Sequence, residues 1–387
     1  MVTKNEIDTV DSQNMHRVYD NWPEIAKEYF SKTFSKIEIK DIDHIVFAGM
    51  GGSGAIGDVF SSILSKTDMH VSIVKGYELP RTVDKNTIIV TTSISGNTTE
   101  TLSILDSAEK TNAKIVALSS GGKMEEFCKK RKMDFYKIKK EHSPRASFLG
   151  FLYASLNVLE DIVPVKKMDI DESIQSLFNI RKSISSQNLT ETNQALQIAQ
   201  WLENIPVMYY PWGLQSTAIR FKNSMQENAK THVIVEDVIE TCHNGIVAWN
   251  KPNKFQPILL QGKDDHVKTK EKFMILSEYF QENNIEETKH FISPKITGEN
   301  MTIGIPIFSW LDPPSIGDEI GVFSQDGLLV GCQIFNGESI DLDLILKSDK
   351  SMDILLGSDS FKSNTVDYNQ HALVVDLFLD KNSIQNI

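Results

Sequence analysis

The stretch TIIVTTSISGNTTET, residues Thr87–Thr101, decides the fold that the sequence predicts. Its first six residues are all β-branched, which is typical of a strand buried on both faces of a sheet. A loop rich in hydroxyls follows, and helical periodicity then runs from Thr99 to Ala108. A buried strand that passes through a short loop into a helix is part of a βαβ unit, so this stretch predicts a parallel sheet.

Strand-like runs alternate with helical patterns on both sides of this stretch. An amphipathic lead-in helix is expected over residues 12–35. Further strands are expected at 44–47, 70–74, 114–118, 135–138, 206–210, 233–235 and 258–260, and further helices at 56–64, 124–130, 145–162, 214–230 and 267–280. We therefore predict two similar α/β units, near residues 36–162 and 171–298, with a linker and a polar helical region between them.

The pattern changes after Pro294. Residues 302–308 alternate between apolar and polar, and Asp326-Gly327 lies between two apolar stretches, which indicates a β-hairpin. The predicted domains are residues 1–165, residues 166–298 and a small β-rich module at 299–387.

Charge is spread unevenly along the chain. The net charge is −12 over 387 residues, and the segment from Met301 onward holds 4 Lys, no Arg and 13 acidic residues. The first 300 residues are therefore close to neutral. An acidic chain without a basic patch argues against nucleic-acid binding.

The three cysteines are scattered, so the sequence predicts neither a disulfide framework nor a cysteine metal site. The N-terminus has no apolar leader pattern. The longest apolar run, residues 146–159, is too short to span a bilayer. We expect a cytoplasmic protein with no membrane partner, no metal and no cofactor.

A glycine-rich loop follows the first predicted strand and includes Gly51, Gly52, Ser53 and Gly54. Its backbone N–H groups and the helix that it opens favour an anion. Gly52-x-Gly54-x-x-Gly57 also fits the dinucleotide fingerprint, so a Rossmann dehydrogenase is an alternative. That alternative requires an acidic residue at the end of the second strand, where this chain has Lys75-Gly76.

The loop within the opening stretch points to a phosphate monoester. Several hydroxyls and a glycine come together at a helix N-terminus, where hydrogen bonds and the helix dipole stabilise an anion. We also expect Asn97 and Glu100 to form a capping box. The candidate binding residues in this loop are Ser93, Ser95, Gly96, Asn97 and Thr98.

These two loops together resemble the sugar isomerase (SIS) domain. Three further stretches are similar to the bifunctional phosphoglucose/phosphomannose isomerase family: Ser143-Pro144-Arg145-Ala146, Gln226-Glu227-Asn228-Ala229-Lys230, and Cys242-His243-Asn244. The resemblance covers about residues 12–295. It implies two flavodoxin-like αβα units of the SIS type and a homodimer.

The resemblance also implies an activity, the interconversion of glucose 6-phosphate, and of mannose 6-phosphate, with fructose 6-phosphate through an enediol(ate). In that scheme the two loops hold the phosphate, Arg145 stabilises negative charge and Glu227 carries the proton. His243 opens the sugar ring and, in such dimers, reaches in from the neighbouring subunit. Glu227 lies off the apolar face of its predicted helix, which agrees with a role outside the core.

The chain also departs from this family. Cys242 and Gly245 stand where the family has Asn and Glu, and no lysine after residue 300 matches the late lysine of the family. A second hypothesis therefore stays open, in which the protein binds a phosphosugar as a non-catalytic sensor.

Overall fold

A computed structural model describes residues 2–39, 41–251, 253–285 and 287–291, and beyond them six strands in the C-terminal part. Side chains are described as far as residue 287. The chain forms two compact units, Met1–Ile292 and Ser293–Ile387. The predicted division at 165/166 and 298/299 stays a prediction.

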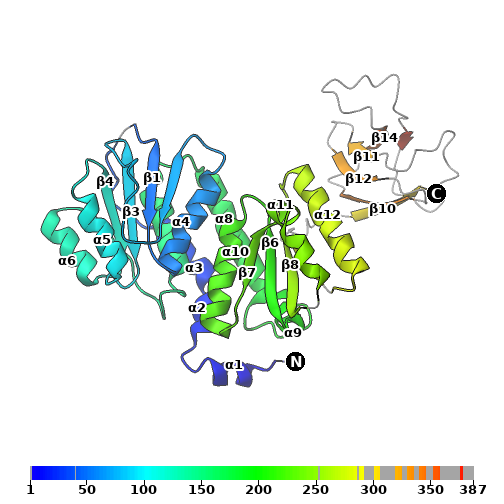
Figure 1. The fold of residues 1–387 in the computed structure, drawn as a ribbon, viewed down its shortest axis with the longest axis horizontal. Helices are drawn as coiled ribbons and strands as arrows, with labels where there is room; N and C mark the ends of the chain where they lie inside the picture. The colour runs from blue at the N-terminus through cyan, green and yellow to red at the C-terminus, as the bar shows by residue number, and fades with distance from the viewer. Residues whose placement is uncertain are drawn as a thin grey trace. The chain divides into compact units, whose positions relative to one another are not determined.

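The first sheet has five parallel strands: β1 (His44–Ala48), β2 (His70–Val74), β3 (Thr87–Ser93), β4 (Lys114–Ser119) and β5 (Asp134–Lys137). Their order is β2-β1-β3-β4-β5, the flavodoxin-like arrangement. Every residue of β3 is buried, because helices cover both faces of the sheet (Figure 1). The α/β fold expected from the opening stretch is confirmed.

Alternate side chains of each strand enter different cores. Ile45, Phe47, Ile88 and Val90 pack with α3 (Trp22–Ser31), α4 (Gly52–Leu64), α7 (Phe148–Val158) and α8 (Lys167–Ile184). Val46 and Ile89 face α5 (Thr99–Ala108), and Ala117 meets both α5 and α6 (Gly122–Arg131). This is a three-layer αβα unit.

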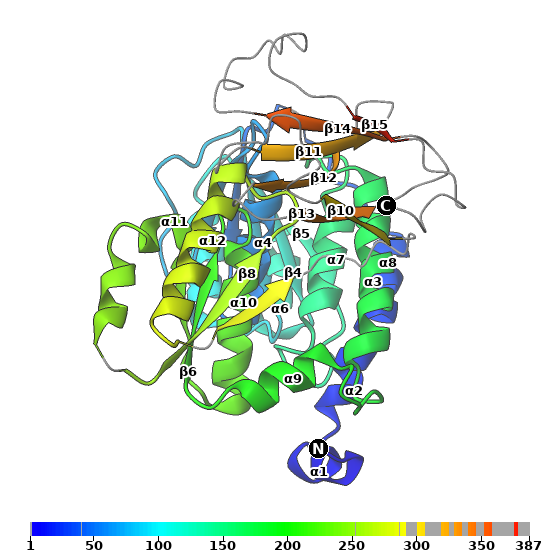
Figure 2. The ribbon, with the colours of Figure 1, turned by 90° about the vertical axis from the view of Figure 1, so that its right-hand side faces the viewer.

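A second parallel sheet follows α9 (Gln194–Trp201) and has the order β7-β6-β8-β9. Its strands are β6 (Ile205–Tyr210), β7 (Ile234–Asp237), β8 (Phe255–Gln261) and β9 (Thr288–Phe291). The helix α10 (Gln215–Ser224) packs on one face, and α11 (Val238–Thr241) and α12 (Val267–Glu282) pack on the other (Figure 2). The order matches that of the first sheet without its last strand.

The helices that follow the first strand of each sheet, α4 and α10, pack against each other. The Ser62 hydroxyl of α4 donates to that of Ser216 in α10 at 3.0 Å. This contact joins the two sheets within one unit. It also brings the start of α4 and the end of α10 near the turn before α7.

Three predicted helices differ from the observed ones. The lead-in helix expected at 12–35 is observed as two helices, α2 (Met15–Asp20) and α3, because Pro23 lacks an N–H and fits only the first turn of a new helix; a short helix that was not predicted, α1 (Lys4–Val10), comes before them. The helix expected at 145–162 begins only at Phe148, which leaves Arg145 in a turn. The segment expected at 214–230 ends in a π-helical turn, Met225–Ala229.

The C-terminal unit contains the strands β10 (Asn300–Ile305), β11 (Glu319–Ser324), β12 (Leu329–Ile334), β13 (Ile340–Ile345), β14 (Met352–Gly357) and β15 (Val375–Leu377). All their pairings are antiparallel. The strands β11 and β12 pair on either side of Asp326-Gly327, as the hairpin signal predicts, although the turn itself lies outside the described residues.

Candidate functional site

The candidate site lies at the carboxyl ends of β1 and β3, the two central strands of the first sheet. In a parallel sheet with this order, connections leave these two strands in opposite directions, and the crevice between them is the usual ligand position. The glycine loop follows β1 and the hydroxyl loop follows β3. The fold therefore places both predicted loops together.

The hydroxyl loop is folded by its own polar groups. Ser93 Oγ lies 2.9 Å from Thr98 Oγ1 and accepts the N–H of Gly96 at 3.1 Å. Ser95 and Asn97 point outward and are exposed, whereas Ser93 is buried. The predicted capping box is wrong, because Thr98 is the N-cap residue and its side chain caps no N–H. Free first-turn N–H groups of α5 at a hydroxyl cluster suit a bound anion.

Gly96 is required in this loop. Its φ is +70°, and a Cβ at this position would lie 1.7 Å from the carbonyl oxygen of Gly121. Only glycine fits so close to the neighbouring backbone.

The glycine loop is fixed to the hydroxyl loop and to the turn before α7. Ser53 Oγ accepts the N–H of Ile94 at 3.3 Å. A Cβ on Gly52 would lie 3.6 Å from the carbonyl oxygen of Pro144 and 3.7 Å from Cα of Arg145. Gly51, with φ +56°, precedes the first turn of α4. The turn that carries Arg145 therefore lies against the glycine loop.

The lysine at the end of β2 has a structural partner. Lys75 Nζ lies 2.7 Å from both carboxylate oxygens of the buried Asp58. A cation and its counter-ion thus occupy the place where a dinucleotide-binding fold needs an acidic residue for the ribose. This arrangement argues against the dehydrogenase alternative.

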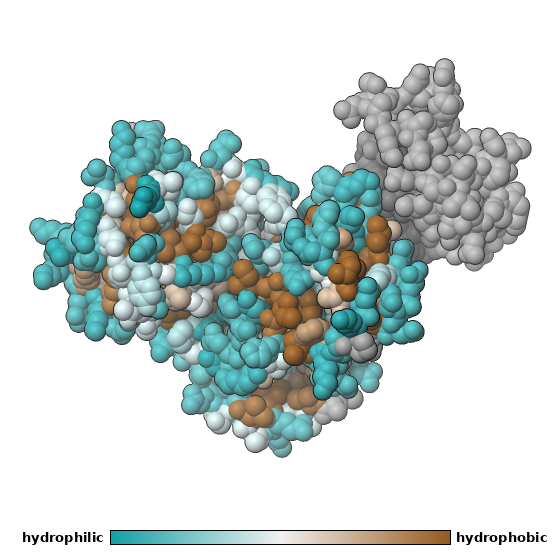
Figure 3. All heavy atoms as spheres, viewed as in Figure 1, coloured by the Kyte–Doolittle hydropathy of each residue, from teal (hydrophilic) through white to brown (hydrophobic). Residues whose placement is uncertain are grey.

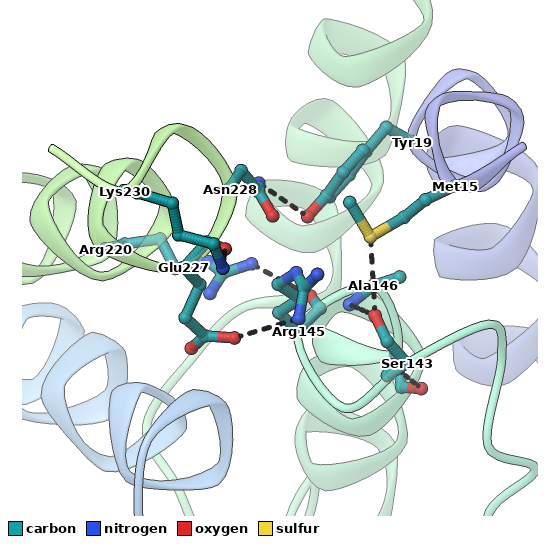
Figure 4. Close-up of polar contacts among 10 residues, drawn as sticks. Met15, Tyr19, Ser143, Arg145, Ala146, Arg220, Glu227, Asn228 and Lys230 are labelled. Carbon is teal, nitrogen blue, oxygen red and sulfur yellow. Dashed lines mark hydrogen bonds and ion pairs between the residues drawn. The ribbon is translucent and has the colours of Figure 1, made fainter. Parts of the chain in front are cut away.

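Arg145 and Glu227 form an ion pair across the unit, although they are 82 positions apart in the chain. Arg145 Nη1 lies 3.3 Å from Glu227 Oε2 (Figure 4), and the side chains are 27% and 41% exposed. Glu227 belongs to the π-helical turn that extends α10, and such turns occur often at functional sites. The structure therefore brings a candidate base beside a fixed cation.

His243 lies elsewhere on the second sheet's side of the unit. It follows α11, is exposed, and is not among the residues that line the cavity at Arg145 and Glu227. Nearby, Val247 is 64% exposed. Within one chain, the described structure does not bring His243 to the other two candidate residues.

A cavity of about 420 Å³ opens beside the Arg145–Glu227 pair. Its walls come from three separate segments: the N-terminal stretch from the end of α1 through α2, the turn before α7, and the end of the α10 extension. The lining residues are Val10, Asp11, Ser12, Gln13, Met15, His16, Tyr19, His142, Arg145, Glu227, Asn228 and Lys230.

Sequence reasoning missed Arg220. Its Nη2 donates to the carbonyl oxygen of Arg145 at 2.9 Å, and its guanidinium stacks 4.6 Å from the ring centroid of Phe148. Burial lowers the pKa of Arg220 below its ordinary value, even though Glu227 acts in the opposite direction. The only sequence signal was its spacing of seven residues from Glu227, which places both on one helix face.

Two further findings concern the described residues alone. No group of three or more His, Cys, Asp and Glu side chains there is arranged to hold a metal ion. Also, none of the described helices has both the length and the apolar character needed to cross a bilayer.

The comparisons with known proteins agree with this geometry. Residues 38–160 match the SIS domain model, and residues 191–300 match the model of the bacterial phospho-glucose isomerase C-terminal SIS domain. Among solved structures, a glucosamine-6-phosphate deaminase from Thermotoga maritima aligns with a TM-score of 0.53 at 12% identity, covering 72% of this chain and 85% of that one. The fold and the loops define an SIS-type αβα protein.

Curated relatives identify the family. A bifunctional phosphoglucose/phosphomannose isomerase from Caldicellulosiruptor bescii is 32% identical over 64% of this chain and 77% of its own length. One from Aquifex aeolicus is 31% identical over 64% and 73%. The chain belongs to the bifunctional phosphoglucose/phosphomannose isomerase family. A more distant relative, from Sulfolobus acidocaldarius, is named D-glucosamine-6-phosphate 4-epimerase and is 26% identical over 64% and 77%.

Proposed function

We propose that the protein is an aldose–ketose isomerase that interconverts glucose 6-phosphate, and also mannose 6-phosphate, with fructose 6-phosphate. The observation that carries the proposal is the Arg145–Glu227 pair, in which Arg145 lies on a turn next to the glycine loop. A carboxylate and a cation next to an anion cradle suit proton transfer on a phosphorylated sugar. The reaction belongs to glycolysis and gluconeogenesis and would take place in the cytoplasm.

In this proposal the phosphate occupies the cradle formed by Gly51, Gly52 and Ser53 with the hydroxyl loop, residues 93–98. Backbone N–H groups, hydroxyls and the dipole of α5 hold it. The cradle fixes one end of the sugar, so that C1 and C2 at the other end reach Glu227 and Arg145.

Glu227 removes the proton from C2 of the open-chain aldose and returns it to C1, while the proton of the C2 hydroxyl passes from O2 to O1, so that C2=O2 forms and O1 becomes a hydroxyl. The intermediate is a cis-enediol(ate), whose oxygens carry negative charge. Arg145 stabilises this charge when the substrate displaces its ion pair with Glu227. Because one carboxylate serves both carbons, the proton can stay on the same face of the intermediate.

His243 is proposed to protonate the ring oxygen during ring opening, and it would do so from a second copy of the chain. Its exposure and the exposed Val247 close by support this arrangement. Apolar side chains also come to the surface near the strands of the second sheet, including Ile234 of β7 and Phe255 of β8 (Figure 3). We therefore propose a homodimer.

The test measures fructose 6-phosphate formation by the wild type and by Glu227→Gln, with binding of glucose 6-phosphate measured in parallel. Glu227→Gln should lower kcat by roughly 10²–10⁴-fold and still bind the sugar, because the cradle is unchanged. Glu271→Gln, an exposed carboxylate on α12, is the matched control. A wild type that binds the sugar phosphate without turnover would favour the sensor hypothesis instead.

A further inference from the structure

The N-terminal segment forms one wall of the cavity beside Glu227 and Arg145, and it carries a histidine paired with a carboxylate. His16 and Asp11 both line the cavity. Tyr19 from the same segment accepts a hydrogen bond from Asn228, the residue after Glu227, at 3.4 Å. The wall is therefore tied to the helix end that presents the candidate base.

The contact between His16 and Asp11 fixes the imidazole. His16 Nδ1 lies 2.8 Å from Asp11 Oδ2, which also accepts the backbone N–H of His16 at 2.7 Å. A charged carboxylate can only accept here, so Nδ1 is the nitrogen that donates to Asp11, and in the neutral ring Nε2 is the nitrogen able to take up a proton. A base oriented in this way by a carboxylate recurs in hydrolytic active sites.

The carboxylate is charged at neutral pH. Burial alone would raise the pKa of Asp11, but hydrogen bonds from the backbone of His16 and Met15 and from the His16 ring lower it below its ordinary value overall. A second carboxylate oxygen, Asp8 Oδ1, lies 3.8 Å from His16 Nε2 and is buried without a hydrogen-bond partner. Two anions therefore flank the ring and would neutralise an imidazolium formed by proton uptake.

Two other histidines lack this combination. His142 lines the same cavity, but both its ring nitrogens are buried without a hydrogen-bond partner, so no carboxylate orients it. His243 is exposed and does not line the cavity.

We infer that His16, held by Asp11, is the base that takes the proton from the anomeric hydroxyl when the sugar ring opens; this inference rests on the proposed isomerase function. The O1 proton passes to Nε2 of His16, and the O1–H electron pair becomes the second bond of C1=O1. The C1–O5 bond breaks, and O5 takes a proton from the acid proposed above, His243 of a second copy. The imidazolium then releases its proton to solvent through the open cavity. Asp11 is a positioning residue.

The experiment uses the full-length protein and glucose 6-phosphate carrying either hydrogen or deuterium at C2. His16→Asn places an amide where Nδ1 lies, so the bond to Asp11 can persist while the base is removed. Its kcat should fall by roughly 10²–10⁴-fold. The isotope effect should shrink toward unity, because ring opening then limits the rate rather than cleavage at C2. Glu227→Asp, which slows the C2 step itself, should keep a large isotope effect.

Two further variants make the test specific. Asp11→Asn should lose less kcat than His16→Asn, with the same collapse of the isotope effect and little change in KM. His70→Gln, at the opposite end of the first sheet, should behave as the wild type. The role of His16 would be overturned if His16→Asn had the same kcat as the wild type. It would also be overturned if kcat fell while the isotope effect stayed undiminished. A wild type without turnover would instead overturn the proposed function, and this inference with it.

Discussion

The two sheets of the first unit share a strand order but differ in what their loops can bind. In the first sheet, the loops after β1 and β3 present glycines, hydroxyls and free N–H groups. In the second, the loop after β6 exposes Trp212. The loop after β8 carries Asp264 and Asp265, and the latter accepts the N–H of Gly262.

This difference assigns separate tasks to the two halves. The loop after β8 offers a carboxyl, that of Asp265, where the first sheet offers hydroxyls; burial raises the pKa of Asp265, although the Gly262 N–H opposes the shift. A phosphate therefore has one suitable cradle among the described loops. The second half contributes Arg220 from α10, which donates to the carbonyl oxygen of Arg145, and Glu227 from the π-helical turn that follows α10. In the proposed function, similar folds would thus provide phosphate binding on one side and proton transfer on the other.

The strongest test of this contrast replaces one loop glycine of positive φ beside each sheet. Gly96→Ala combines backbone strain with overlap against Gly121 and should cost at least about 3 kcal/mol of unfolding free energy, with a large rise in KM. Gly213→Ala, after β6, has φ +96° but no atom within 4 Å, so it should cost only about 1–2 kcal/mol. Urea unfolding and KM for glucose 6-phosphate measure both. Equal effects would contradict the contrast.

A second test separates stability from activity at Arg220. Arg220→Met removes a buried cation whose Nε and Nη1 have no hydrogen-bond partner, so the unfolding free energy should change by about 1 kcal/mol or less. Arg145 loses its backbone anchor, so kcat should fall roughly 10–100-fold. Arg131→Met is the control, since Arg131 also stacks on a phenylalanine, Phe127, but belongs to α6 and does not line the cavity. Unchanged kcat in Arg220→Met would exclude the anchoring role.

A smaller effect is expected from a single hydroxyl of the cradle. Ser93→Ala removes the group that receives the Gly96 N–H and contacts Thr98, so KM should rise about 10-fold with kcat nearly unchanged. Ser103→Ala, on α5 outside the loop, should leave KM as it is. Initial rates over a range of glucose 6-phosphate concentrations give both constants. A fall in kcat at constant KM in Ser93→Ala would instead show that this hydroxyl acts in the chemical step and not in substrate binding.

The smallest expected effect concerns the pH dependence of the unfolding free energy, to which His44 of the first sheet contributes. Burial and the neighbouring His70 lower the pKa of His44 below its ordinary value of 6.5, while a backbone hydrogen bond with Thr82 and the charges of Asp43 and Asp84 act in the opposite direction. The unfolded chain therefore takes up this proton first, and stability present above pH 6.5 is lost as the pH falls toward the lower folded pKa. Urea unfolding between pH 7 and 5 should show the slope, and His44→Gln should reduce it.

The sequence predicted the sheets well because their signals are local. Six β-branched residues and a hydroxyl loop define β3 and the turn into α5 without reference to any other part of the chain. Pro23 was visible as well, but the apolar spacing of Val18, Trp22 and Ile25 outweighed it, so one helix was predicted in place of two.

The site was harder to predict because its parts meet only through tertiary packing. Family resemblance named Arg145 and Glu227, but their ion pair depends on α10 packing against α4 and on a turn that replaces the predicted helix start. His16 lies near the chain's beginning in a stretch without any motif, and nothing in the sequence connects it with Glu227. Arg220 was visible only as a polar position on the same helix face.

The most direct test of the central claim, that Glu227 moves a proton between C1 and C2, is turnover of glucose 6-phosphate in deuterium oxide followed by NMR. If Glu227 moves the proton, wild-type protein forms fructose 6-phosphate and introduces solvent deuterium at C1 of the ketose and C2 of the recovered aldose. Glu227→Gln should bind the sugar and introduce none. Ketose formed with no deuterium at either carbon, the same incorporation by Glu227→Gln, or a change at C4 instead of C1 and C2 would contradict it.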